Sequence, residues 1–478
     1  MLDNSAILAV AALAALAAGL TALSRPRLCL GILFLIASIS RATLETPLGT
    51  MRPEMPAILV VAVVLLASGR FRSLSRPPRL TLAMCLAFAV YLGVLTFSSA
   101  FVAPGRSQSL HMVAWLAMSM LAGIEAFILI QPKAVEAIRP LAFGGFFIGA
   151  TGILFAAAFL VAGPVFNLGV QEAYAAVPRV YGLAWEANLY ASFLAICAFF
   201  ALEEFREHRA MAGLAMLAAI LIGFPLGITR AAYVGLGVGA VAYAVARLVV
   251  ERRLHDILRL AAISVALLAV GIGASMILLP NVIQRDYAPP VTGGLVASGG
   301  TVAGAPASPA PVPTFGPSTD TMAYRMERVD VAVGELPKSP LIGFGAVSFG
   351  QENPGRYNGS GPDYIAVMFV AVLYESGVVG AAALALGFAL LLASLWISAL
   401  RFAARRDSRG AGTAAAFFGS IVCMLVAYQA TNALPYAVSW VVIGTASALA
   451  ASNTSAATLR DLFRPRQSQA GQNINMDG

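Results

Sequence analysis

The stretch Thr81-Leu-Ala-Met-Cys-Leu-Ala-Phe-Ala-Val-Tyr-Leu-Gly-Val-Leu-Thr-Phe-Ser-Ser-Ala-Phe-Val-Ala103 decides the fold class of this chain. It carries no charge over a length that, as a helix rising about 1.5 Å per residue, crosses the ~30 Å hydrocarbon core of a bilayer. Because that core holds no water to bind peptide groups, the backbone must satisfy its hydrogen bonds within the segment, which predicts a helix. Ser5–Leu23, Leu141–Gly163 and Ile257–Pro280 repeat the apolar pattern.

The composition of the whole chain agrees with this interpretation. Hydrophobic residues make up 59% of the 478 residues and charged residues only 11%, and the mean hydropathy is +0.82. A soluble domain needs far more charge to cover its surface. We therefore predict an all-α integral membrane protein, a polytopic bundle of about 13 transmembrane helices. The predicted spans are 5–23, 28–40, 55–68, 81–103, 109–131, 141–163, 183–202, 210–227, 231–249, 257–280, 377–400, 411–429 and 434–452.

The positions of Lys and Arg predict the orientation of the chain. With the N-terminus outside, roughly two thirds of the 31 Lys and Arg residues fall on the inner side, as the positive-inside rule requires. This predicts a multi-pass protein of a bacterial inner membrane whose tail, residues 453–478, is cytoplasmic. The net charge of +8 then reflects topology and contact with membrane lipid. No nucleic-acid partner is expected, because no basic stretch with interleaved aromatic residues is present.

One connection is much longer than the others and divides the chain. Residues 281–363 follow the first ten predicted helices (1–280) and precede the last three (364–452), which predicts one large periplasmic loop. Residues 288–318 are rich in Pro, Gly, Ala and Ser, which is typical of a flexible linker. Residues 321–350 show helical periodicity followed by Pro and Gly, so we expect an ordered segment there.

Four short stretches lie on the predicted outer side, around this loop. They are Arg179-Val-Tyr-Gly-Leu-Ala-Trp-Glu-Ala-Asn188, Gly227-Ile-Thr-Arg-Ala-Ala232, Tyr324-Arg-Met-Glu-Arg-Val together with Lys338-Ser-Pro-Leu-Ile-Gly-Phe-Gly345, and Leu373-Tyr-Glu-Ser-Gly-Val-Val-Gly380. In order and location, these stretches resemble motifs of the O-antigen polymerase and ligase family. The resemblance covers roughly residues 160–400, and the remainder is similar only as generic membrane helices.

The resemblance implies a polymerase of undecaprenyl-diphosphate-linked repeat units, of an O-antigen or exopolysaccharide. Its partners would be the undecaprenyl-diphosphate-linked oligosaccharide and, in the same pathway, a chain-length regulator and a flippase. Ligases of the family carry a His-Asn pair where this chain has Ala366 and Val367. Polymerase activity is therefore favoured over ligase activity. The alternatives are an O-antigen ligase, or a transporter or flippase of lipid-linked glycans, although no internal repeat or midplane charge pattern of a transporter is visible.

Arginines are the expected ligands of the diphosphate. A guanidinium stays charged and grips phosphate oxygens at two points, and it would stabilise the charge that builds on the leaving group. Arg230, Arg325 and Arg328 are the predicted catalytic arginines, while Arg179 is expected to bind substrate together with Asn188 and Tyr324. Snorkelling to head groups or a solvated helix face would explain the same arginines without a function.

Three carboxylates are candidates for orienting or deprotonating the acceptor hydroxyl. Glu186 lies a few residues inside the predicted helix 183–202, where a pair with Arg179 is the alternative explanation. Asp363 precedes the next apolar segment and could instead cap its helix. Glu375 could serve as a polar anchor at a helix break before Gly377.

Other polar and aromatic residues gave weaker signals. Glu125 lies in the middle of an apolar stretch without an obvious partner, and Trp185 and Tyr190 could stack on sugar rings or anchor the membrane interface. The four cysteines lie far apart in apolar runs and predict no disulfide framework. No metal and no cofactor are expected, since no cluster of ligands is present.

Overall fold

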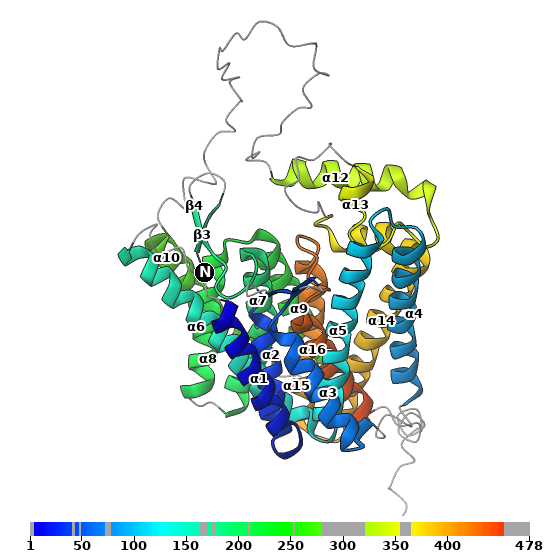
Figure 1. Cartoon of the computed structure of the whole chain (residues 1–478). Helices are drawn as coiled ribbons and strands as arrows, with labels where there is room; N and C mark the ends of the chain where they lie inside the picture. Colours follow the sequence, from blue (N-terminus) through cyan, green and yellow to red (C-terminus); the bar gives the residue numbers. More distant parts are fainter. Residues whose placement is uncertain are drawn as a thin grey trace, which may run out of the picture.

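The computed structural model describes residues 4–40, 44–46, 49–71, 78–162, 170–173, 177–208, 211–251, 254–279, 321–353 and 365–453. Within them the chain is a helical bundle with two small hairpins, β1 (Leu44–Thr46) with β2 (Gly49–Met51) and β3 (Val170–Ala173) with β4 (Val177–Val180). Figure 1 shows α12 (Thr321–Glu335) lying across one end of the bundle. We call this the upper end and the opposite one the lower end.

Each of the thirteen predicted apolar segments coincides with a helix. The helices are α1 (Asn4–Ser24), α2 (Pro26–Ser38), α3 (Glu54–Ala67), α4 (Arg79–Phe101), α5 (Arg106–Ile130), α6 (Ile138–Ala162), α7 (Ala187–His208), α8 (Met211–Gly223), α9 (Arg230–Glu251), α10 (Leu254–Leu278), α14 (Met368–Ala404), α15 (Ser408–Ala427) and α16 (Ala437–Asn453). Among the described residues, eight helices are long and apolar enough to cross a membrane, and five apolar helices are shorter. An all-α, multi-pass membrane protein is therefore supported, while thirteen crossings remain a prediction.

Short elements connect these helices at both ends. At the lower end, the 3₁₀ helix η2 (Gln131–Ala137) links α5 to α6. At the upper end, η4 (Phe224–Gly227) precedes α9, and η5 (Leu336–Lys338) and α13 (Phe349–Glu352) follow α12. Over the predicted ordered segment 321–350, the structure has α12 and the turns that follow it. The predicted linker 288–318 and nearly all of the predicted tail 453–478 lie outside the described residues.

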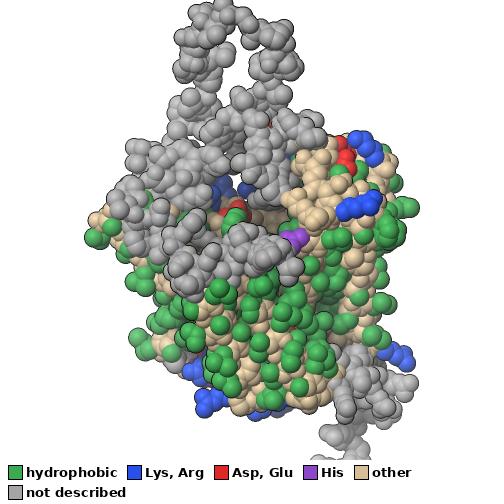
Figure 2. Space-filling view, in the orientation of Figure 1, with side chains coloured by type: hydrophobic (Ala, Val, Ile, Leu, Met, Phe, Trp, Pro, Cys, Tyr) green, Lys and Arg blue, Asp and Glu red, His purple; other side chains and the backbone are tan. Residues whose placement is uncertain are grey.

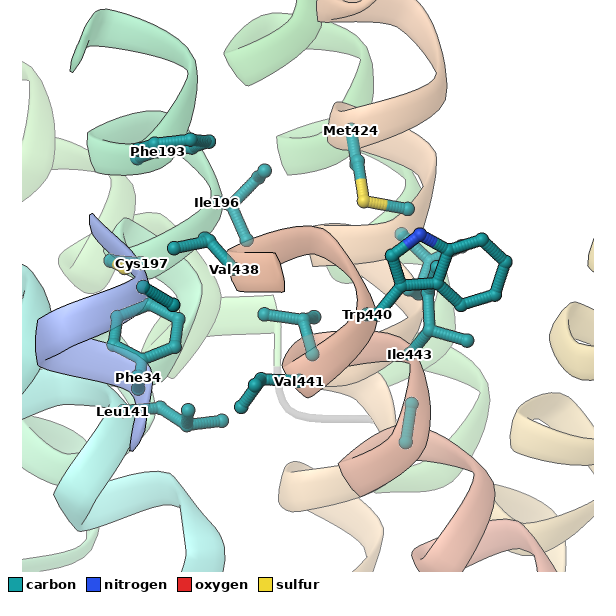
Figure 3. Close-up of a cluster of buried hydrophobic side chains, with 14 of the residues drawn as sticks. Phe34, Leu141, Phe193, Ile196, Cys197, Met424, Val438, Trp440, Val441 and Ile443 are labelled. Carbon is teal, nitrogen blue, oxygen red and sulfur yellow. The ribbon is translucent and has the colours of Figure 1, made fainter. Parts of the chain in front are cut away.

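The centre of the bundle is apolar and closely packed. Helices α7, α15 and α16 are buried on almost every side, whereas α10 is exposed along most of its length. Figure 3 shows side chains from five helices meeting in this core: Phe34, Leu141, Phe193, Ile196, Cys197, Met424, Val438, Trp440, Val441 and Ile443. Apolar side chains also cover the outside as a broad belt (Figure 2), as expected of a surface that faces lipid.

Glycines allow the closest helix contacts. A methyl group on Gly239 of α9 would lie 2.8 Å from the backbone oxygen of Gly419 in α15, and one on Gly444 of α16 would overlap the backbone of Gly123 in α5. Small residues at such contacts let helix backbones approach closely where lipid offers no hydrophobic driving force. The pairs α9–α15 and α5–α16 are accordingly among the most closely packed in the bundle.

Candidate functional site at the upper end

Arg179 joins the first two family-like stretches. It lies on β4, and its Nη2 is 3.0 Å from Asn188 Oδ1 and 3.1 Å from Thr229 Oγ1. The same guanidinium donates to the backbone oxygens of Gly227 and Ile228 at 3.1 and 3.2 Å. Arg179 therefore holds the turn before α9 against the start of α7, and its hydrogen bonds fix the backbone of that turn. We call Arg179, Asn188 and Gly227–Thr229 the arginine clamp.

The arginine clamp stabilises an unusual turn. Ile228 has φ 46° and ψ 57°, a left-handed conformation that a β-branched residue seldom adopts. Such backbone strain persists only where surrounding contacts hold it, and it clusters at functional sites. The turn buries Thr229 and makes Arg230 the first residue of α9, where its side chain is exposed at the upper end.

Glu186 is in a different place from the one predicted. Helix α7 begins at Ala187, so Glu186 lies just ahead of the helix and is not inside it. A glycine in a left-handed conformation at Gly182 (φ 57°) and a turn to Ala184 delay the helix start, which the apolar character of the segment did not reveal. The Thr431 hydroxyl donates a hydrogen bond to Glu186 Oε1, so the loop between α15 and α16 contacts this carboxylate.

Arg52 is a site residue that the sequence reasoning missed. Its guanidinium lies between two aromatic rings, 4.0 Å from the centre of Trp115 and 4.2 Å from that of Tyr436. Arg52 Nη1 lies 3.9 Å from Glu54 Oε1 and donates to the Pro435 carbonyl at 3.4 Å. Arg52 therefore links the start of α3 to α5 and to the loop ahead of α16. The sequence shows only an arginine and a glutamate directly ahead of an apolar run, an ordinary position for charges at the end of a membrane span, so it gave no signal for this contact.

The third and fourth family-like stretches pack against each other. Helix α14 is interrupted at Gly377 (φ 62°, ψ −171°), as the sequence suggested. The break frees backbone groups, and the Phe344 and Gly345 N–H groups donate to the Tyr374 and Glu375 carbonyls, each at 2.9 Å. In return, the Val378 N–H donates to the backbone carbonyl of residue 340 at 2.9 Å, and the Val379 N–H donates to that of residue 341 at 3.1 Å. The loop segment thus replaces the hydrogen bonds that the helix loses.

Glu375 and its neighbour Tyr374 hold the loop in place. Glu375 Oε1 accepts a hydrogen bond from the Val347 N–H at 3.0 Å, and the Tyr374 hydroxyl donates to Glu335 Oε2 at 2.7 Å. The Tyr374 ring stacks on Phe344 with 4.6 Å between centres. Burial raises the pKa of Glu335, but the hydrogen bonds from Tyr374 and Asn353 and the Lys338 charge outweigh it and keep that pKa below its usual range.

The remaining predicted residues belong to the loop. Arg325 is half-buried and Arg328 is buried on α12. Tyr324 lies in the first turn of the same helix, but its side chain is outside the described parts of the structure, as is the whole of Asp363. The loop is anchored to other helices as well, because Ser99 Oγ accepts from the Ala346 N–H at 3.0 Å and Gln351 bonds to the Gly105 N–H at 2.8 Å.

The predicted residues therefore form two neighbourhoods. The first contains the arginine clamp, Arg230 and Glu186, and the second contains α12 and Glu375. The start of α14 links them, since its Met368 N–H donates to the Tyr428 carbonyl at 3.3 Å, three residues ahead of Thr431. Figure 2 shows both basic and acidic side chains in a recess at this upper end.

Two other residues that the sequence singled out, Tyr190 and Glu125, lie outside these two neighbourhoods. Tyr190 is fully buried, with its hydroxyl 3.1 Å from the Gly223 carbonyl, so stacking on a sugar is wrong for this residue, whereas Trp185 is exposed. Glu125 is buried in α5, and neither of its oxygens has a hydrogen-bond partner within the described parts of the chain. Among the same residues, no group of three or more His, Cys, Asp or Glu side chains forms a metal site.

Comparison with protein-family models finds no matching family, and comparison with curated proteins finds no match.

Proposed function

We propose that this protein is a membrane glycosyltransferase that polymerises undecaprenyl-diphosphate-linked repeat units. The observation that carries the proposal is the arginine clamp. It holds a strained turn that places Arg230 at the N-terminus of α9. This turn lies beside the start of α7, which Glu186 directly precedes. A guanidinium at the positive end of a helix dipole is a suitable partner for a diphosphate.

The proposed reaction is a glycosyl transfer. A hydroxyl oxygen of the acceptor sugar attacks the anomeric carbon of the donor glycan and forms the new glycosidic bond. The bond between that carbon and the diphosphate oxygen breaks, and undecaprenyl diphosphate leaves with the electron pair. Arg230 stabilises the negative charge of the leaving group, and the arginines of α12, Arg325 and Arg328, are the second source of positive charge.

Glu186 is the carboxylate that we propose to accept the hydroxyl proton. It lies at the upper end, outside helix α7, and its hydrogen bond from Thr431 orients it. Glu375 is assigned a positioning role, because its carboxylate holds the Val347 backbone. Asn188 acts through Arg179, and Tyr324 and Asp363 stay candidates from the sequence alone.

The proposed location is a bacterial inner membrane with the upper end facing the periplasm and the C-terminal tail in the cytoplasm. The distribution of charge supports this orientation, because Arg25, Arg27, Arg70 and Lys133 lie at the lower end, and Figure 2 shows basic side chains gathered there. The lipid-linked oligosaccharide, a chain-length regulator and a flippase remain the proposed partners.

Deletion of the gene, followed by analysis of lipid-linked intermediates, tests this function. We expect single repeat units to accumulate on the carrier and polymer to disappear. Full-length polymer that stays on the carrier would identify a ligase, and intermediates confined to the inner leaflet would identify a flippase. Complementation with Arg230→Ala should fail, whereas Arg106→Ala should succeed, since Arg106 is also exposed as the first residue of an upper-end helix, α5.

A further inference from the structure

A second concave site lies at the lower end, away from the proposed catalytic residues. It is a cavity of about 750 Å³ between the α1–α2 turn, the residues after α3 and the junction of α5 with η2. The lining residues come from these three segments: Ser24, Arg25, Pro26, Arg27, Leu28, Gly69, Arg70, Ile128, Leu129, Ile130, Gln131 and Lys133.

The polar part of this lining is strongly basic. Four cations line the cavity, and none of the described residues that line it is acidic. Arg27 forms an ion pair with Glu136, which lies outside the lining, and Arg70 donates to the Leu23 carbonyl at 3.2 Å. Arg25 and Lys133 are exposed. A concave surface of one charge sign focuses its potential and attracts ions of the opposite sign.

Several helix ends meet at this cavity. Helix α2 begins at Pro26, so Arg25 and Arg27 flank its N-terminus, whereas α1 ends at Ser24 and α5 ends at Ile130. The dipoles of α1 and α5 present their negative ends here, which favours nearby cations, and the Arg70 guanidinium donates to a carbonyl in the last turn of α1. The positive potential of the cavity therefore comes from its four cationic side chains.

The remaining walls of the cavity are apolar. Leu28 and Ile128–Ile130 line the cavity, and Leu20 and Leu23 on the neighbouring α1 are exposed. A cationic mouth beside apolar walls matches a molecule with a phosphate head and hydrocarbon chains. Basic pockets between transmembrane helices bind such head groups. We propose that this cavity binds the phosphate of an anionic membrane lipid, independently of the reaction at the upper end.

The test uses the full chain in nanodiscs of phosphatidylcholine. Phosphatidylglycerol is titrated in, and bound lipid is counted by native mass spectrometry while thermal unfolding is followed. The double variant Arg25→Gln/Lys133→Gln should bind the anionic lipid on the order of 30-fold more weakly than the unchanged chain. The matched control is Arg139→Gln/Arg405→Gln, which removes the same charge from exposed positions at the same end, outside the cavity.

Each outcome decides the proposal. Weaker binding in the cavity variant alone supports it. Equal loss in both double variants would show that only the surface potential attracts the lipid, and would overturn it. Inorganic phosphate is added in a parallel titration without anionic lipid. If phosphate alone raises the unfolding temperature through Arg25 and Lys133 while phosphatidylglycerol adds nothing, the cavity serves a soluble phosphate and the lipid assignment is wrong.

Discussion

The Arg179 guanidinium donates a hydrogen bond of 3.0 Å to the side-chain oxygen of Asn188, and so joins strand β4 to the first turn of α7. Because the same guanidinium also holds the Gly227 and Ile228 carbonyls, one side chain fixes the turn that presents Arg230. These two arginines at the upper end therefore have different roles. Arg179 positions the backbone, and Arg230 is proposed to bind the substrate.

Replacing Arg179 and Arg230 should therefore have different consequences. Arg179→Ala leaves partly buried acceptors unsatisfied, and we expect it to lower the free energy of unfolding by about 1–3 kcal/mol and to abolish polymer. Arg230→Ala should abolish polymer while leaving the unfolding temperature unchanged. Thermal unfolding of both purified variants, together with polymer yield in cells, measures the difference. Equal loss of stability in Arg179→Ala and Arg230→Ala would contradict the separate roles given to these two residues.

The break in α14 makes a second prediction. A methyl group at Gly377 would overlap the backbone of Leu341, and Gly377 has a left-handed φ of 62°. Gly377→Ala should destabilise the docked loop by about 2 kcal/mol or more and expose it to limited proteolysis. Gly334→Ala in α12 is the matched control, because nothing lies within 4 Å of the added methyl group. It should be neutral or stabilise the helix by up to about 1 kcal/mol.

Glu335 gives the loop a dependence on pH. Since hydrogen bonds and Lys338 keep the pKa of Glu335 below its usual range, its contribution to stability is complete above the unfolded pKa of about 4.3. The contribution is lost as the pH falls through the lower folded pKa. The free energy of unfolding of Glu335→Gln should therefore be lower than that of the unchanged chain at pH 7, and the two should converge as the pH falls from about 4.3 through the folded pKa of Glu335. Tyr374→Phe removes one of the hydrogen bonds to Glu335, so part of the pH dependence of the unfolding free energy should be lost in this variant. A difference between Glu335→Gln and the unchanged chain that stays the same at every pH would contradict this account.

A buried ion pair at the lower end should be sensitive to the loss of one partner. Arg247 Nη2 lies 2.9 and 3.0 Å from the two oxygens of Glu203, and both residues are almost fully buried. Arg247→Met should cost about 1.5–3 kcal/mol, because Glu203 loses a buried charged partner but keeps Arg206 and the Tyr243 hydroxyl, each at 2.9 Å. Arg139→Met at the same end removes an exposed partner 3.7 Å from Glu204 and should cost about 1 kcal/mol or less. Chemical denaturation in detergent compares the two variants.

The sequence predicted the helices well because burial in lipid imposes a uniform rule. The run Thr81–Ala103 became α4 with its ends shifted by two residues. The periodicity after residue 321 likewise predicted α12. These predictions needed only local composition, since each helix satisfies its own backbone.

The contacts of the site were harder to foresee. Gly343 and Gly377 were visible as motif residues in the sequence. Their close backbone contact, however, joins two segments more than thirty residues apart in the chain, which the sequence does not reveal. Arg179 was expected to bind phosphate, and its acceptors in this structure, the backbone oxygens at 227 and 228, have no signature in the sequence. Arg52 was missed because its two aromatic partners come from distant parts of the chain, Trp115 from α5 and Tyr436 from the loop ahead of α16.

Reconstitution tests the central claim most directly. The purified chain in nanodiscs is supplied with undecaprenyl-diphosphate-linked repeat units, and the products are separated by mass. We predict a ladder of lipid-linked oligomers, with one undecaprenyl diphosphate released for each bond formed, which Arg106→Ala preserves and Arg230→Ala abolishes. Repeat units that stay single in the presence of the folded, unchanged chain would contradict the account.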